Sequence, residues 1–247
     1  MVKYILLGVI QGITEFLPVS SSAHLVIMQK ILGLGGEEAV LAIVLHLGTC
    51  LALIVFFFAD IKRTLGNKKI LSYIIIVTII TGIIGITGKN FFERLFSSVT
   101  VVALGLIVTG IILILTRKFM HARRSNLTVK DAIILGITQG IAIIPGISRS
   151  GITISTLLFR KIDRETSFRF SFLASIPAVI GASLLEAKDI GFALRLEPIN
   201  FTIGFILSFF TGLLSLRILK IALRKANLYY FGYYCIVVAI IALLFVR

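Results

Sequence analysis

Apolar residues form six runs along the chain that are long enough, or nearly long enough, to cross a membrane. They cover residues 39–59, 70–88, 97–116, 170–185, 198–216 and 226–246. A helix needs about 20 apolar residues to cross the hydrocarbon core of a bilayer. Because the fourth run is short, we expect its helix to cover 167–187. The pattern therefore predicts six transmembrane helices.

Two further segments, residues 4–29 and 131–159, are apolar but interrupted by proline and polar residues. Each continuous apolar piece is only about 10 to 14 residues long, a length that favours a re-entrant segment over a span. Irregular backbone at membrane depth is tolerated only where protein buries it or water reaches it. We expect each segment to form a re-entrant pair of short helices.

The two interrupted segments repeat one another at an offset of 128 residues. The identical pairs are Gly8/Gly136, Gln11/Gln139, Gly12/Gly140, Ile13/Ile141, Ser20/Ser148 and Ser22/Ser150. The same offset carries the first three spans onto the last three. The sequence therefore predicts two repeats, 1–124 and 125–247, each with a re-entrant pair and three spans. Since three crossings reverse direction, the expected fold is an all-α integral membrane protein with two inverted-topology repeats.

Composition and charge agree with a lipid environment. The chain is 58% hydrophobic and 15% charged, whereas soluble domains are about 45–50% apolar and about 25% charged. Its net charge of +14 would suggest nucleic acid in a soluble protein. Here anionic headgroups and cytoplasmic loops explain the charge better, so we expect a bilayer and no nucleic acid as partner. A phosphorylated substrate is also compatible.

The loop charges predict an orientation. Loops after the first, third and fifth spans hold thirteen lysines and arginines, whereas those after the second and fourth hold four, including Lys188 and Arg195. The positive-inside rule places the richer loops in the cytoplasm. The first re-entrant segment then enters from outside and the second from inside. Inverted repeats of this kind place polar sites near the midplane, where half-helices converge.

Glu15 lies in an apolar stretch, and an intramembrane carboxylate marks a functional site by default. Gln11 precedes it by four residues, on the same helical face. Their oxygens suit Mg²⁺ or Ca²⁺, with a substrate phosphate completing the coordination shell. The alternative is that Glu15 caps a short helix or pairs with a lysine. His46, in the middle of a span, is expected to be buried and hydrogen-bonded.

Three serines and His24 follow Pro18. One serine is expected to cap a helix, but three hydroxyl groups and an imidazole exceed what a cap requires. Ser21 and His24 are three residues apart and share a helical face. This spacing suits a hydroxyl nucleophile with an imidazole base, or an imidazole that itself attacks phosphorus. We expect Ser20 and Ser22 to contact substrate.

The string Pro145-Gly-Ile-Ser-Arg-Ser-Gly-Ile-Thr153 is the most specific in the chain. Proline and Gly146 break one helix, and the exposed N–H groups that begin the next form an anion site. Arg149 adds a charge and a bidentate fork that matches phosphate oxygens. The alternative is an ion pair between Arg149 and Glu15, and a phosphate can sit between the two. Further hydroxyl donors come from Ser148, Ser150 and Thr153.

These two motifs resemble those of the undecaprenyl-diphosphatase family, also called bacitracin-resistance proteins. The matching strings are Gln11-Gly-Ile-Thr-Glu-Phe-Leu-Pro-Val-Ser-Ser-Ser-Ala-His24, the motif at 145–153, and Phe170-Ser-Phe-Leu-Ala-Ser-Ile-Pro177. The resemblance implies a bacterial plasma-membrane enzyme that hydrolyses undecaprenyl diphosphate to undecaprenyl phosphate and inorganic phosphate. That reaction recycles the carrier for cell-wall synthesis and confers bacitracin resistance. The resemblance also implies a need for Mg²⁺ or Ca²⁺ and a site opening to the outer face.

The same resemblance assigns roles to individual residues. Catalytic positions fall on Glu15, Ser21, His24, Ser148 and Arg149, and substrate-binding positions on Gln11, Ser20, Ser22, Gly146, Ser150 and Thr153; the metal ligands are Glu15 and Gln11. Two departures stand out. Many members of the family have glutamate where this chain has Gln11. Many also have an arginine, shortly after the aromatic pair near the end, where this chain has Tyr234-Cys235.

A polyprenyl-phosphate flippase or secondary transporter is the alternative function, because such proteins are often built from inverted repeats with broken helices. The concentration of serine, histidine and arginine in two motifs, together with the family resemblance, favours hydrolysis. The expected substrate is a polyprenyl diphosphate lipid. The sequence does not determine the oligomeric state, and a homodimer is one of the possibilities.

Overall fold

A computed structural model describes residues 1–32, 38–121, 123–186 and 198–246, and these fold almost wholly into helices. The first half contains α1 (Val2–Phe16), α2 (Ser21–Leu32), α3 (Glu38–Phe56), α4 (Phe58–Leu65), α5 (Lys68–Thr87), α6 (Lys89–Phe96), α7 (Val99–Leu115) and the short 3₁₀ helix η1 (Thr116–Phe119). The second half contains α8 (Val129–Ile141), α9 (Arg149–Phe159), α10 (Arg164–Glu186), α12 (Pro198–Arg224) and α13 (Leu228–Phe245). Lys188, Arg195 and the predicted span end at 187 lie outside the described residues.

Five helices of the described chain are long and apolar enough to cross a membrane: α5, α7 with η1, α10, α12 and α13. The bent pair formed by α3 and α4 supplies a sixth span when it is counted as one. The prediction of an all-α membrane protein with six spans is therefore confirmed.

The first span differs from its predicted bounds of 39–59. Its helix α3 ends at Phe56, and α4 turns away from it by 69°. The cause is the polar content of α4, which includes Asp60 and Lys62. Asp60 accepts a hydrogen bond from the Arg169 guanidinium at 3.2 Å, and such a pair would be costly deeper in the hydrocarbon.

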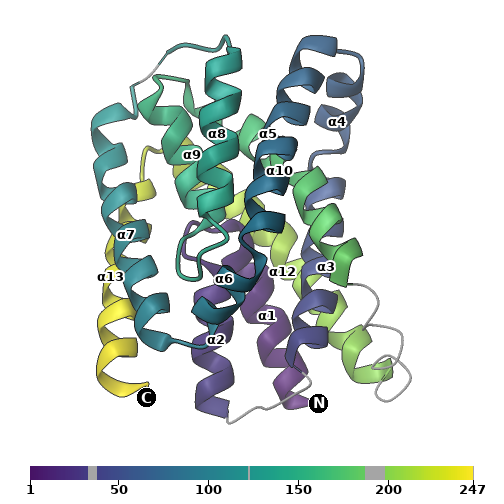
Figure 1. The fold of residues 1–247 in the computed structure, drawn as a ribbon, viewed down its shortest axis with the longest axis vertical. Helices are drawn as coiled ribbons and strands as arrows, with labels where there is room; N and C mark the ends of the chain where they lie inside the picture. Colours follow the sequence, from purple (N-terminus) through teal and green to yellow (C-terminus); the bar gives the residue numbers. More distant parts are fainter. Residues whose placement is uncertain (33–37, 122, 187–197, 247) are drawn as a thin grey trace.

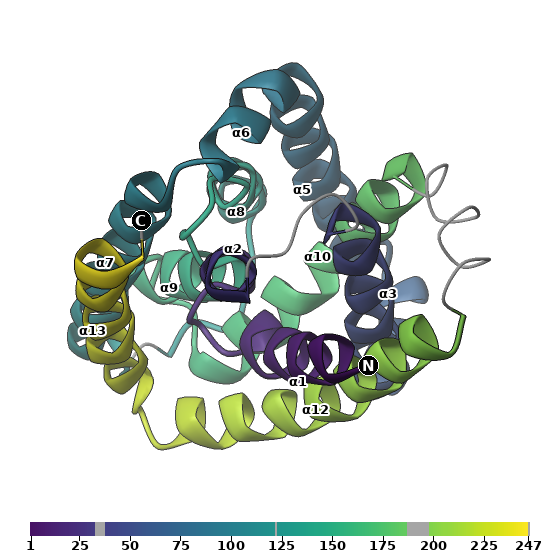
Figure 2. The same ribbon diagram turned by 90° about the horizontal axis from the view of Figure 1, so that it is seen from below.

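The two re-entrant segments form helical hairpins at opposite ends of the molecule. Figure 1 shows α1 and α2 at the end where both termini lie, and α8 and α9 descending from the other end. Viewed from below, these short helices lie within a ring of longer ones (Figure 2). The hairpins therefore meet inside the protein, where irregular backbone is screened from lipid.

Packing between the halves follows the repeat. Helix α1 of the first half packs along α12 of the second, and α8 of the second packs along α5 of the first. The glycines Gly8, Gly12, Gly136 and Gly140 allow this close approach. A Cβ atom on Gly12 would lie 2.6 Å from the Ser208 carbonyl oxygen, and one on Gly140 would lie 2.5 Å from Ile84 Cδ1. These glycines therefore serve the close packing of helices.

Candidate active site

Residues from both halves of the chain meet at the carboxylate of Glu15, in the last turn of α1. Its Oε1 forms an ion pair with Arg149, the first residue of α9. Its Oε2 accepts hydrogen bonds from Ser21 Oγ at 2.6 Å and from Gln11 Nε2 at 3.1 Å. Glu15 and Gln11 are buried. The structure therefore contains the Glu15–Arg149 pair that the sequence left as an alternative.

Two polar atoms of this cluster are buried without a hydrogen-bond partner in the described structure: Gln11 Oε1 and Arg149 Nη1. A buried unpaired polar atom is costly and calls for a ligand or a function. Gln11 Oε1 is an acceptor, and Arg149 Nη1 is a donor with positive charge. The cluster therefore has one open position suited to a cation or a donor, and another suited to an anion.

Two helix N-termini converge on the cluster. Ser20 Oγ accepts a hydrogen bond from Ala23 N at 3.4 Å, and Ser148 Oγ accepts one from Gly151 N at 3.2 Å. The expected serine N-cap after Pro18 is therefore confirmed at Ser20. Ser148, which was expected only as a hydroxyl donor, caps α9 at the equivalent position of the second repeat. The neighbouring hydroxyl groups of Ser22 and Ser150 lie 3.1 and 3.3 Å from these caps. Since α2 and α9 begin beside Glu15, their positive ends favour an anion there.

His24 is not hydrogen-bonded to Ser21, contrary to the expected nucleophile and base pair. Its Nδ1 lies 2.8 Å from the Ser20 carbonyl oxygen and its Nε2 lies 2.8 Å from the Tyr234 hydroxyl. Since a carbonyl only accepts, Nδ1 carries the hydrogen and Nε2 accepts from Tyr234. The Ser21 hydroxyl donates to Glu15 instead.

Two residues at the site were not identified by the sequence. His46 Nδ1 lies 3.0 Å from Gln11 Nε2 and 3.5 Å from Glu15 Oε2. Its side chain is 37% exposed, so the expected hydrogen bond exists but the expected burial is wrong. Tyr234, from α13, sits at the position where the chain departs from many family members. That departure was the only sequence signal for it.

Helix α7 fixes the break between α8 and α9. Thr109 Oγ1 donates to the Gly146 carbonyl at 3.0 Å and accepts from Ser148 N at 2.9 Å. Gly146 has φ +91°, in the left-handed region that favours glycine. Further along α9, Thr153 Oγ1 lies 2.6 Å from both the Arg149 carbonyl and Ser171 Oγ. Gly146 and Thr153 thus support the backbone that carries Arg149.

Replacing Gly146 with alanine is expected to destabilise the protein by about 3 kcal/mol or more, as a strained φ and a steric overlap combine. The new Cβ would lie 2.1 Å from the Val102 carbonyl oxygen. Gly82→Ala is the matched control, because a Cβ at Gly82 has no neighbour within 4 Å. Thermal unfolding in detergent measures both variants. A Gly146→Ala protein as stable as Gly82→Ala would contradict the assigned backbone role.

Comparisons with known proteins cover nearly the whole chain. The profile of a family described as "Bacitracin resistance protein BacA" matches residues 4–241. A protein of Halothermothrix orenii named undecaprenyl-diphosphatase is 41% identical over 98% of this chain and 96% of its own length. Proteins with that name from Thermotoga petrophila and Methanobrevibacter smithii are 41% and 37% identical, over 97% and 98% of this chain and 98% and 96% of their own lengths.

Proposed function

Because this chain belongs to the bacitracin resistance protein BacA family, it is an undecaprenyl-diphosphatase, and we propose that the cluster around Glu15 and Arg149 is its active site. The reaction cleaves undecaprenyl diphosphate into undecaprenyl phosphate and inorganic phosphate. One observation carries the assignment: Arg149 Nη1 is a buried cationic donor with no hydrogen-bond partner in the described structure. It lies where two helix N-termini meet, which is where a phosphate would be stabilised.

The terminal phosphate of the substrate binds between Arg149 and the N-terminal turns of α2 and α9. Its oxygens accept hydrogen bonds from Arg149 Nη1 and from hydroxyl groups in these turns, including those of Ser22 and Ser150. Positive charge and fixed donors at this position stabilise the extra negative charge that develops on the phosphoryl oxygens. The isoprenoid tail lies along the apolar outer faces of the spans.

The geometry favours Ser21 as the attacking group. Its hydroxyl donates to Glu15 Oε2 at 2.6 Å, within the reach required of a nucleophile and its base. The Ser21 oxygen attacks the terminal phosphorus and its proton passes to Glu15. The bond from that phosphorus to the bridging oxygen breaks, and undecaprenyl phosphate leaves. Water then hydrolyses the phosphoserine and releases inorganic phosphate. His24 is less suited to attack because both its ring nitrogens are hydrogen-bonded.

Replacing Ser21 with alanine is expected to lower the rate of phosphate release about 10²-fold, with slower attack by water accounting for the remainder. Substrate labelled in its terminal phosphate should leave label on the wild-type protein after an acid quench, and none on the variant. Ser22→Ala is the matched control: it removes a phosphate-binding hydroxyl but keeps the Ser21–Glu15 hydrogen bond, so at saturating substrate it should still carry the label. Equal labelling of Ser21→Ala and wild type would exclude Ser21 as the nucleophile.

We also propose that Glu15 and Gln11 hold Mg²⁺ or Ca²⁺. The carboxylate and the unpaired Gln11 Oε1 are the oxygen ligands that these ions prefer. In the part of the chain that the structure describes, no group of three or more His, Cys, Asp or Glu could hold a metal ion. Substrate phosphates must therefore supply the rest of the shell. When bound, the ion would neutralise charge on the phosphoryl oxygens.

The proposed location is the bacterial plasma membrane, with the site opening to the outer face. The α1–α2 hairpin lies at the same end as both termini (Figure 1). The cation-rich loops that follow the first, third and fifth spans belong to the opposite end. If those loops are cytoplasmic, as the positive-inside rule requires, the hairpin that carries Glu15 and Ser21 enters from outside.

Purified protein in detergent, supplied with undecaprenyl diphosphate and Mg²⁺, tests the proposed function. We expect inorganic phosphate to be released, and release to stop when EDTA removes the metal and to resume when Mg²⁺ is restored. Release that is unchanged in EDTA would exclude the metal. The flippase alternative predicts lipid movement across vesicle membranes with no phosphate formed, and that outcome would overturn the hydrolytic assignment.

A further inference from the structure

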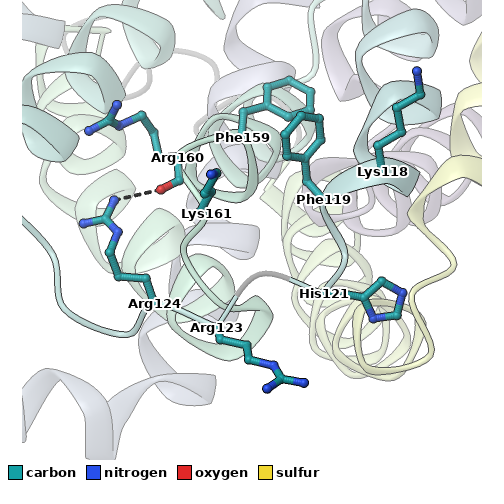
Figure 3. A pocket seen from close by; sticks show the side chains of 8 residues that line it. All are labelled: Lys118, Phe119, His121, Arg123, Arg124, Phe159, Arg160 and Lys161. Carbon is teal, nitrogen blue, oxygen red and sulfur yellow. Dashed lines mark hydrogen bonds between the residues drawn. The ribbon is translucent and has the colours of Figure 1, made fainter.

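A cavity of about 770 Å³ is lined by residues that follow α7 and by residues at the end of α9. These segments lie at the end of the molecule opposite the termini (Figure 1). Figure 3 shows the side chains that line it, which come from η1, the loop after η1, the last residue of α9 and the two residues that follow α9. They are Lys118, Phe119, His121, Arg123, Arg124, Phe159, Arg160 and Lys161. This volume is within the usual range for small-molecule sites, and the described lining has five lysines and arginines but no acidic residue.

Two of the cations are held by a carboxylate behind the cavity wall. Asp131 is fully buried, and it accepts from Arg124 at 2.8 and 2.9 Å and from Arg160 at 2.8 Å. Lys118, Arg123 and Lys161 have no ion pair among the described residues, and all three are exposed. The cavity therefore presents three uncompensated positive charges.

The wall is rigidly built. Arg124 N donates to the Lys161 carbonyl at 3.2 Å, and Asp163 N donates to the Arg124 carbonyl at 2.9 Å. The Arg124 guanidinium also donates to the Arg160 carbonyl at 2.8 Å, the bond drawn in Figure 3. The positive-inside rule accounts for cations at this end, but it does not account for a cavity whose shape is fixed by a buried carboxylate. Such pre-organisation lowers the entropic cost of binding a ligand.

The cavity also has an apolar side that continues into the membrane. The rings of Phe119 and Phe159 pack edge to face with centroids 5.0 Å apart. Phe119 ends the span Val99–Phe119, so the cavity lies where lipid headgroups lie. Ile111 and Leu115 lie four residues apart on one face of α7, just before η1, and are 49% and 46% exposed.

We propose that this pocket binds the phosphate headgroup of an anionic membrane lipid. The three uncompensated cations contact the phosphate, and an acyl chain follows Phe119, Leu115 and Ile111 along α7. Basic pockets beside transmembrane helices are the usual form of such sites. The pocket shares no residue with the cluster around Glu15. Helix α9 separates Arg149 from Arg160, which corresponds to about 16 Å at 1.5 Å per residue.

Native mass spectrometry of the purified full-length protein, titrated with phosphatidylglycerol or phosphatidylcholine, tests the proposal. We expect the double variant Lys118→Gln/Lys161→Gln to bind phosphatidylglycerol about 10- to 30-fold more weakly than wild type. Lys68→Gln/Lys69→Gln is the matched control, because it removes two exposed cations from another of the cation-rich loops, outside the pocket. Its affinity should stay within about twofold of wild type.

Three outcomes would overturn the proposal: an equal loss in the control, equal binding of phosphatidylcholine by wild type, or binding of inorganic phosphate as tight as that of phosphatidylglycerol. The last outcome would identify a free-phosphate site. Phosphate release from undecaprenyl diphosphate, measured on the same samples in detergent, should be unchanged by the pocket variants. This arm keeps the result separate from the assignment of the active site.

Discussion

Replacing Glu15 with alanine is expected to lower the rate of phosphate release by about 10⁴-fold, at the upper end of what a lost general base costs. The carboxylate has three tasks in the proposed mechanism: it takes the Ser21 proton, it orients Arg149, and it ligates the metal. Contacts to Ser21, Arg149 and Gln11 converge on its two oxygens. A steady-state phosphate assay in detergent measures the loss.

Two controls accompany Glu15→Ala. Glu15→Gln keeps the size of the side chain and an oxygen for Arg149, but an amide does not take the Ser21 proton, so its loss should be within about tenfold of the alanine variant. Asp60→Asn changes a carboxylate that also pairs with an arginine, Arg169, and should remain active. Thermal unfolding confirms that each variant is folded. Wild-type activity in a folded Glu15→Gln protein would exclude Glu15 as the general base.

Replacing Arg149 with alanine is expected to lower the rate about 10³-fold, the loss typical of an arginine that stabilises a transferring phosphoryl group. Its Nη1 is the buried donor left unpaired, and Nη2 pairs with Glu15. Because the charge on the phosphoryl group grows in the transition state, the loss should fall mainly on kcat and less on KM. The same assay, run over a range of substrate concentrations, separates the two constants.

Arg149→Lys is the informative companion variant, because it keeps the charge but loses the planar fork that allows Nη1 and Nη2 to act together. We expect the rate of Arg149→Lys to exceed that of Arg149→Ala by at most about tenfold. Arg169→Lys is the matched control, since that arginine pairs with Asp60 away from the site. Full activity in Arg149→Lys would show that the site requires only a point charge.

Much of the fold could be predicted from the sequence, because it depends on local periodicity and on the repeat. Apolar run lengths gave the spans, and the offset of 128 residues placed two helix breaks in equivalent positions. A serine cap after Pro18 was expected from local chemistry, and Ser20 supplies it. The bend after α3 was missed, because Phe56, Phe57 and Phe58 are all apolar and the polar side of α4 begins only with Asp60.

The sequence motifs predicted which residues belong to the candidate site, but not all of the contacts between them. Glu15 and Arg149 are far apart in the sequence, yet inverted repeats predict that their hairpins converge. Spacing on one helix predicted a pair between Ser21 and His24, whereas in the structure Ser21 donates a hydrogen bond to Glu15. His24 and Tyr234, which form a hydrogen bond, are 210 positions apart in the sequence. A local sequence pattern cannot predict such a contact.

The divergence between the repeats is consistent with one proposed site instead of two. At the offset of 128 residues, Glu15 corresponds to Ile143, and Arg149 corresponds to Ser21. The first half therefore carries the carboxylate and the second carries the guanidinium, and each lacks the other's group. In the proposed mechanism neither half is sufficient for phosphate transfer, so the catalytic unit is the pair of hairpins.

A double-mutant cycle on phosphate release tests this shared site most directly. It compares wild type, Glu15→Gln, Arg149→Lys and the double variant, each checked for folding. If both residues act on the same phosphoryl group as one unit, the double variant should be only slightly slower than the slower single variant. Losses that multiply, as they do for independent and distant positions, would contradict a single site built from both repeats.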